Sequence, residues 1–181
     1  MRGFVRIAAV LMLSWPALAA AGEFQSAYTD VDFGQCTFIE SDDTGSLSVC
    51  PGWRGYPLVI GEGDLRMFVT YGIDPLKERA AEQTLPPFNT LGKKMEWRLE
   101  EVDGALVPRA TILRWFTSRE GMPDGQVLVV TQLKTGATCH VAYIDALAVK
   151  NANEKAQNIA DATGDFDCSN EPEIVGTFGA W

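Results

Sequence analysis

The stretch from Cys50 to Gly72 reads CPGWRGYPLVIGEGDLRMFVTYG, and it predicts a β-hairpin. Two apolar runs, Tyr56 to Ile60 and Leu65 to Tyr71, flank residues 61–64, Gly-Glu-Gly-Asp. The two glycines can adopt the positive φ that a short hairpin loop requires. Cys36 lies 14 positions before Cys50, so a disulfide between them would hold the preceding strand at the base of the hairpin. The stretch is therefore typical of an antiparallel β protein from an oxidising compartment.

The first 21 residues have the organisation of a secretory signal peptide. Arg2 and Arg6 precede an apolar run from Ile7 to Leu13, and the small residues Ala19 to Ala21 follow. The apolar run is too short to cross a bilayer. We therefore expect residues 1–21 to be removed and residues 22–181 to form a single β-rich domain that is periplasmic or secreted.

The exported part carries a strong negative charge. The full chain has 15 Lys and Arg against 24 Asp and Glu, and loss of Arg2 and Arg6 leaves 13 against 24, a net charge of −11. Nucleic acids and anionic lipid surfaces bind basic faces, so the charge argues against both, and no membrane span is expected after signal cleavage. A basic protein or another envelope component remains as a partner, although a solvated acidic surface explains the same composition.

All four cysteines, Cys36, Cys50, Cys139 and Cys168, lie in the exported part. An even number in an oxidising compartment predicts two disulfides, for which three pairings exist. Pairing Cys36 with Cys50 and Cys139 with Cys168 is favoured because each bond closes a local loop, worth about 3 kcal/mol in the chain-entropy model. Zinc is the rival interpretation, but no C-x-x-C spacing occurs.

Further strands follow the first hairpin. Met95, Trp97 and Leu99 alternate with charged residues, which indicates a half-buried strand, and Asp103-Gly104 is a two-residue hairpin signal. A central strand is expected over residues 127–133, and the last clear strand is expected over residues 138–147. Residues 22–32 lack periodicity and are expected to be a partly ordered lead-in. Residues 84–92 contain Pro86-Pro87 and are expected to be a loop.

Two helices are expected. A short one over residues 75–83 would begin with Asp74 as N-cap and Pro75 in the first turn. The second follows Asn151, where alanines recur at helical spacing on one stripe. The fold class is therefore mainly β (α+β): a single antiparallel β domain of about eight strands with a C-terminal helix and two disulfides.

Four segments together resemble a family of small secreted, periplasmic proteins of Gram-negative bacteria. They are Phe88-Asn89-Thr90, Glu96-Trp97-Arg98, the run from Cys139 to Tyr143, and the segment from Ala160-Asp161 to Phe166-Asp167-Cys168. The resemblance extends over most of the exported part. It implies export and the disulfide pattern, and it assigns no catalytic residue because the family carries no known activity.

The sequence nominates no catalytic residue and no cofactor. His140 is the only histidine, so Ser-His or Cys-His chemistry would have to use it. Its nearest acid along the strand, Asp145, is five positions away and on the opposite face. The apolar strand around His140 indicates a structural role. Glu96 and Glu100 share a face with Arg98 between them, which indicates ion pairs across strands rather than an acid/base pair.

Two loops are candidate binding sites. Trp53, Arg54 and Tyr56 lie in a Pro- and Gly-rich loop, where exposed rings would anchor a partner or a sugar; the alternative is that Trp53 covers Cys50. The second loop has the oxygen ligands that calcium prefers, but it does not match an EF-hand, and Asp is common in turns for local reasons. Its members are Asp165, Asp167, Asn170 and Glu171.

The sequence supports two functions. The first is an exported, non-catalytic binding protein of the cell envelope, whose acidic surface and 53–56 loop contact a basic protein such as a lysozyme. The second is a carboxylate-dependent hydrolase of cell-wall or sugar substrates, which requires a cleft with two facing carboxylates about 5–9 Å apart.

Overall fold

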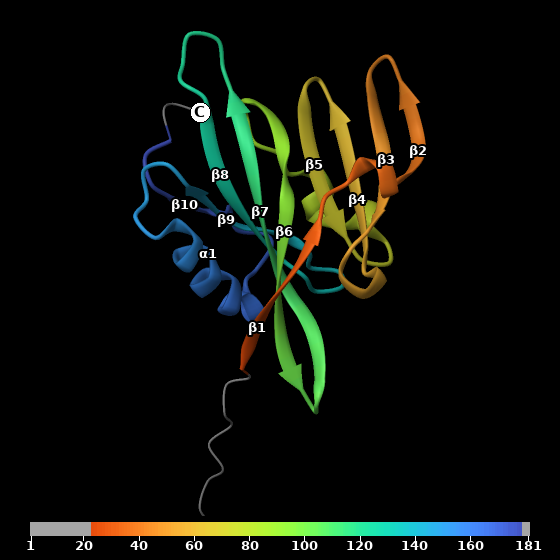
Figure 1. Ribbon diagram of the computed structural model, residues 1–181, viewed down its shortest axis with the longest axis vertical. Helices are drawn as coiled ribbons and strands as arrows, with labels where there is room; N and C mark the ends of the chain where they lie inside the picture. Colours follow the sequence, from red (N-terminus) through yellow and green to blue (C-terminus); the bar gives the residue numbers. More distant parts are fainter. Residues whose placement is uncertain (1–22, 179–181) are drawn as a thin grey trace, which may run out of the picture.

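The computed structural model describes residues 23–178, in which ten strands form two sheets (Figure 1). One sheet has the order β1-β6-β7-β8-β9-β10 and the other the order β2-β3-β4-β5. All pairs are antiparallel except β9 with β10. The strands are β1 (Phe24–Asp30), β2 (Thr37–Asp42), β3 (Gly45–Pro51), β4 (Pro57–Gly63), β5 (Arg66–Tyr71), β6 (Phe88–Val102), β7 (Ala105–Ser118), β8 (Gly125–Gln132), β9 (Cys139–Asp145) and β10 (Glu173–Val175).

The helical elements are one α-helix and five short 3-10 turns. They are η1 (Phe33–Gln35), η2 (Trp53–Gly55), η3 (Pro75–Lys77), η4 (Arg79–Glu82), α1 (Ala152–Asp161) and η5 (Thr163–Asp165). In residues 23–178 no helix is long and apolar enough to cross a membrane. The predicted signal peptide, residues 1–21, lies outside the described residues.

The six-stranded sheet has a hydrophobic core on each face. The core between the two sheets buries the largest side chains, among them Trp97, Trp115 and Tyr71. The other core lies under α1, which buries Ala152, Ala156 and Ala160 against the sheet. Alanine side chains allow the helix axis to approach the strands closely. Figure 1 shows α1 on one side of the six-stranded sheet and the four-stranded sheet on the other.

The structure confirms the predicted fold class, a mainly β chain with a C-terminal helix and two disulfides. Cys36 is bonded to Cys50 and Cys139 to Cys168, with Cα separations of 4.2 and 5.8 Å. The first bond joins the segment before β2 to β3. The second joins the start of β9 to the segment after η5. Both pairings are the local ones that loop closure favours.

The two predicted hairpins are present, one with a shifted turn. The Asp103-Gly104 turn joins β6 and β7, and both residues have positive φ. The turn between β4 and β5 falls at Asp64-Leu65, with φ of 51° and 60°, rather than over residues 61–64. Gly61 belongs to β4 and serves packing, since the Phe68 ring lies where a Cβ atom would stand.

The prediction of about eight strands is wrong, because the sheets contain ten. Residues 22–32 were expected to be a lead-in, but β1 pairs along β6 from Phe24↔Glu100 to Asp30↔Lys94. Mostly exposed polar residues give this edge strand no apolar alternation. The predicted loop over residues 84–92 ends early, because β6 begins at Phe88.

The predicted helix over residues 75–83 forms the 3-10 turns η3 and η4 instead. Tertiary contacts use the polar groups of this segment. The Ala80 N–H donates to the Thr138 carbonyl at 3.0 Å, and the Glu78 carboxylate accepts from the N–H groups of Gly136 and Thr138 at 2.7 and 2.9 Å. Glu78 and Ala80 are buried, so the segment lies against the loop before β9 rather than on the outside.

Candidate functional site

Exposed apolar side chains gather at the end of the molecule that carries three hairpin turns. The turns β2–β3, β4–β5 and β7–β8 all lie at the top of Figure 1. A hollow of about 640 Å³ is lined there by Leu65, Phe88 and Phe116, which are 62%, 44% and 41% exposed. A neighbouring hollow shares Leu65 and adds Phe38, which is 61% exposed. We call the surface lined by Phe38, Leu65, Phe88 and Phe116 the tip groove.

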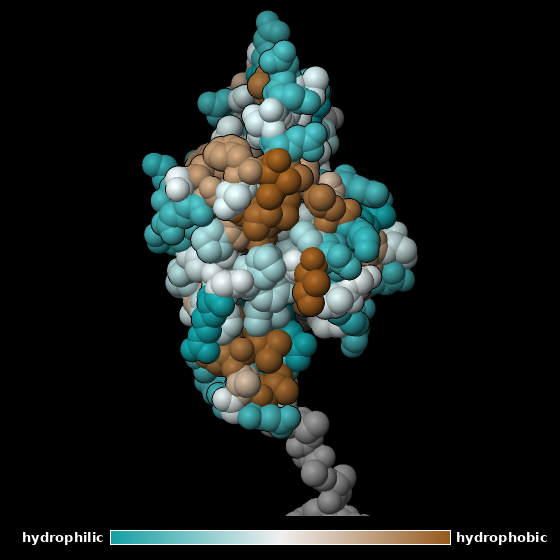
Figure 2. All heavy atoms as spheres, turned by 90° about the vertical axis from the view of Figure 1, so that its right-hand side faces the viewer, coloured by the Kyte–Doolittle hydropathy of each residue, from teal (hydrophilic) through white to brown (hydrophobic). Residues whose placement is uncertain are grey.

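Figure 2 looks at the side of the molecule that carries β2. Hydrophobic atoms gather in the upper middle of this face, with hydrophilic side chains around them. Single exposed apolar side chains are normal on a protein surface, but a contiguous group rimmed by polar residues is typical of an interaction site.

Asn89 fixes the geometry of the tip groove by joining the two sheets beneath it. Its backbone N–H donates to the Leu65 carbonyl at 3.0 Å, and its side-chain Oδ1 accepts from the Met67 N–H at 2.9 Å. Its Nδ2 donates to the carbonyls of Leu85 and Pro87 at 3.1 and 2.9 Å. The side chain is buried and its polar atoms are satisfied, so it holds the start of β6 against β5.

Asp42, Asp43, Glu62 and Asp64 line the hollow that contains Phe38 and Leu65, and Glu40 lines an adjoining hollow with Asp42 and Glu62. We call these five residues the tip carboxylates. Within residues 23–178 only Asp64 among them makes an ion pair, at 2.6 Å to Arg66. The Arg66 guanidinium also lies 5.6 Å from the centre of the Phe88 ring.

Two tip carboxylates also shape the turns that carry them. Asp42 accepts from the Thr44 hydroxyl and from the N–H groups of Thr44 and Gly45, and the hydroxyl hydrogen bond in particular lowers the pKa of Asp42. The Glu62 carboxylate accepts from the Leu65 N–H at 2.9 Å. The tip carboxylates therefore combine a local structural role with a surplus of negative charge.

A smaller hollow of about 210 Å³ adjoins the first at the base of the β7–β8 hairpin. It shares Thr117, Ser118 and Asp124 with the hollow of the tip groove and adds the apolar residues Met122 and Leu147. The apolar surface at this end of the molecule therefore continues around the start of β8.

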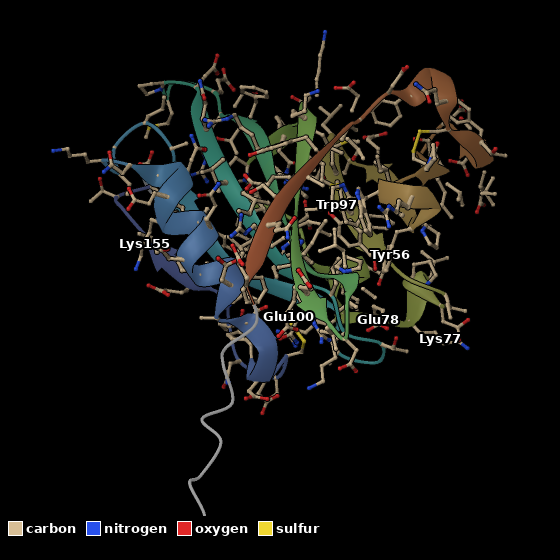
Figure 3. The ribbon with its side chains drawn as sticks, turned by 60° about the horizontal axis from the view of Figure 1, so that its bottom comes forward. Tyr56, Lys77, Glu78, Trp97, Glu100 and Lys155 are labelled. Atoms are coloured by element: carbon tan, nitrogen blue, oxygen red, sulfur yellow. A yellow bond between two sulfur atoms is a disulfide. The ribbon has the colours of Figure 1, made fainter. Side chains whose placement is uncertain are left out.

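The predicted partner-binding loop is packed against the core along part of its length. Tyr56 and Trp53 are half-buried and contact the core between the sheets, and the Tyr56 ring meets Trp97 edge-on at 5.7 Å. Figure 3 shows Tyr56 beside Trp97. The Arg54 guanidinium lies over Trp53, 4.6 Å from the ring centre. Neither ring lines the tip groove, so the structure does not bring this loop together with the exposed apolar surface.

His140 is fully buried between the sheets. Its Nδ1 lies 2.8 Å from the Tyr143 hydroxyl, its backbone N–H donates to Gln83, and its ring meets Trp115 edge-on at 5.9 Å. Burial lowers the pKa of His140 to about 3, so the ring is neutral at pH 7. Since the ring has no access to solvent, the structure gives it packing contacts rather than a substrate.

The acidic row on β6 is paired with arginines. Arg98 makes a two-pronged contact with Asp161 of α1, at 2.7 and 2.6 Å, and also lies 3.5 Å from Glu96. Hydrogen bonding to Asp161 raises the pKa of Arg98. Glu100 is paired with Arg109 at 2.6 Å. The Arg98–Asp161 contact docks α1 on the sheet, whereas the Glu100–Arg109 pair joins β6 to β7. Glu96 and Glu100 therefore each lie next to an arginine.

In the structure, Asp167 and Glu171 of the predicted calcium site each contact a different residue. Asp167 accepts from the Ser169 N–H at 2.9 Å, and Glu171 pairs with Arg79 at 3.1 Å. Hydrogen bonding from Ser169 lowers the pKa of Asp167. In the described part of the chain no three His, Cys, Asp or Glu side chains are grouped in a way that would hold a metal ion. Asp165 and Asn170 are exposed members of the same loop.

Comparison with protein families, curated proteins and solved structures gave no match. The site therefore has to be judged from its own geometry. Sequence reasoning did not identify the tip groove, whose four apolar residues come from β2, the β4–β5 turn, β6 and β7. The available local signal was Phe38-Ile39, two large apolar neighbours in a short strand that cannot both point to the core.

Proposed function

We propose that this chain is an exported, non-catalytic binding protein of the cell envelope that uses the tip groove and its carboxylates to hold a basic protein. The observation that carries the proposal is an exposed apolar surface with four carboxylates in its lining and a fifth, Glu40, in the adjoining hollow; among residues 23–178 only Asp64 of these five has an arginine partner.

Export is supported by the two disulfides, which are typical of the periplasm and of secreted proteins. It is also supported by the three-part leader in the sequence. The resemblance to small periplasmic proteins of Gram-negative bacteria fits the same compartment.

The chemistry of the tip groove supports binding of a cationic surface. Apolar side chains at the centre of an interface lose water on contact, while charged groups at the rim set partner choice and association rate. The full chain carries a net charge of −9, which attracts a basic protein from a distance. A basic partner with one or two apolar side chains among its lysines or arginines would satisfy both parts of the groove.

The proposal is tested by titrating the mature chain, residues 22–181, with lysozyme as a basic probe in a calorimeter. We expect binding at about 0.02 M salt that weakens at least tenfold by about 0.3 M, because the Debye length falls from about 20 Å to about 6 Å. A protein of similar size and acidic charge serves as the control and is expected not to bind. Absence of lysozyme binding at low salt, or binding that ignores salt, would contradict the proposal.

A further inference from the structure

One edge of the four-stranded sheet is open along its whole length. β2 is the outermost strand of that sheet, and β3 is its only strand partner among residues 23–178. All six residues of β2 are exposed. A strand in this position presents a row of backbone N–H and C=O groups that another extended chain can pair with.

The edge strand of the six-stranded sheet, β1, differs from β2 in its side chains. β1 has one large exposed apolar side chain, Tyr28, whereas β2 has two, Phe38 and Ile39, at 61% and 59% exposure. Phe38 lines the same hollow as Leu65 of the tip groove. A strand added along β2 would therefore place its own side chains beside Phe38 and in reach of the groove.

The charges along β2 decide between two occupants. Glu40 and Asp42 lie in the strand and Asp43 follows it, and none of them makes an ion pair within the described residues. A second copy of this chain would bring the same carboxylates close to their own kind, which costs energy on a sheet edge. A strand that carries lysine or arginine would meet opposite charge instead.

Resting on the proposed function, we propose that β2 accepts an extended, lysine- or arginine-rich segment of the partner as an added strand of the four-stranded sheet. Main-chain hydrogen bonds would supply affinity. Phe38 and Leu65 would receive apolar side chains of the segment, and Glu40, Asp42 and Asp43 its cations. The bulge between Phe38 and Glu40, where Ile39 has no partner on β3, bends the strand at its centre.

The test compares two synthetic peptides of alternating lysine and valine that differ only in their backbone. The second peptide is N-methylated at two adjacent central residues, so it loses a donor on each edge but keeps every charge and side chain. We expect the first peptide to bind at low salt and to protect the amides of residues 37–42 from hydrogen exchange. The methylated peptide is expected to bind at least about tenfold more weakly, since lost main-chain hydrogen bonds are not replaced.

Two variants test whether the peptide binds at β2. Phe38→Ser is expected to weaken the unmethylated peptide about fivefold or more, whereas Ile73→Ser is expected to leave it unchanged. Both side chains are exposed, Ile73 at 89%, so neither change removes core packing. Unfolding midpoints of the two variants verify that both remain folded.

The outcomes separate this inference from the proposed function. Equal, salt-sensitive binding of both peptides would overturn strand addition while leaving a basic partner in place. No binding of either peptide, together with salt-sensitive binding of lysozyme, would also overturn strand addition alone. Without peptide, the amides of residues 37–42 could become more protected from hydrogen exchange as the protein concentration rises. That result would show that β2 pairs with a second copy of the chain, and it would overturn the inference.

Discussion

Individual buried polar side chains in this molecule join segments that lie far apart in the sequence. Asn89 satisfies its amide with four groups of neighbouring segments, and His140 is enclosed between Trp115 and Tyr143. Hydrogen bonds with neighbouring residues let the Asn89 amide and His140 Nδ1 lie in apolar surroundings.

The burial of His140 predicts a specific loss of stability in acid. In the unfolded chain the ring takes up a proton near its ordinary pKa of 6.5. In the folded chain burial lowers the pKa of His140 to about 3. The neutral, buried ring therefore makes its full contribution to the free energy of unfolding above pH 6.5, and this contribution is lost as the pH falls from 6.5 toward 3. The expected slope from this one proton is about 1.4 kcal/mol per pH unit.

Urea unfolding of the wild type and of His140→Phe, measured from about pH 7 to about pH 4, isolates this proton. The variant is expected to be less stable at neutral pH, since the hydrogen bond between His140 Nδ1 and the Tyr143 hydroxyl is lost, but to show a shallower decline in acid. Carboxylates such as Asp42 and Asp167 contribute equally to both curves and cancel in the difference. Parallel curves would show that the pKa of His140 in the folded chain stays near its ordinary value of 6.5, and would contradict its burial.

At the scale of elements, the sequence predicted what local signals determine. The four cysteines gave both pairings, the Asp103-Gly104 dipeptide gave a hairpin turn, and the alanine stripe gave α1. Each of these depends on residues close in sequence or on a covalent bond.

Elements that depend on distant partners were missed. β1 is a strand because β6 pairs with it along seven residues, and its own alternation is weak. Residues 75–83 form 3-10 turns because Glu78 and Ala80 bond the loop before β9. The tip groove was missed for the same reason, since three hairpins contribute to it and none signals it alone. In contrast, the 53–56 loop was locally conspicuous, yet its rings pack on Trp97 and the core.

The docking of α1 through Arg98 and Asp161 predicts an unequal cost for two similar substitutions. Asp161→Asn removes one charge of a largely buried contact, because the Arg98 side chain is 10% exposed, and about 2 kcal/mol of unfolding free energy should be lost. Glu100→Gln removes a charge opposite Arg109, whose side chain is 42% exposed, so a loss below about 1 kcal/mol is expected.

Chemical denaturation of both variants at neutral pH measures the two losses. The pair is matched because each substitution keeps the side-chain shape and removes one negative charge from a strand-helix or strand-strand contact to arginine. Equal losses would mean that Arg98 does not need Asp161 to hold the helix. Amide exchange in residues 152–161 should also quicken in Asp161→Asn alone.

At the scale of the whole molecule, the buried cores lie apart from the surface that we propose binds a partner. The cores, both disulfides and the Arg98 network lie along the body of the sheets, whereas the tip groove and its carboxylates lie on exposed turns and on parts of β2, β4, β6 and β7. Surface charges on turns can be changed with little effect on folding. The proposed binding function is therefore separable from stability by substitution.

Charge neutralisation at two places tests that separation most directly. One variant combines Glu40→Gln, Asp43→Asn and Glu62→Gln at the tip, and the other combines Glu154→Gln, Asp165→Asn and Glu173→Gln on exposed positions of α1, η5 and β10. Both raise the net charge by three, so long-range attraction of a basic protein changes equally.

The deciding measurement is the dissociation constant of lysozyme for these two variants, taken in the same low-salt buffer. The tip variant is expected to bind at least about tenfold more weakly than the wild type, which corresponds to about 0.5 kcal/mol for each lost contact. The variant changed at α1, η5 and β10 is expected to stay within about threefold of the wild type, because it loses only long-range attraction. Equal weakening in both variants would show that net charge alone attracts the partner and would contradict a binding site at the tip groove.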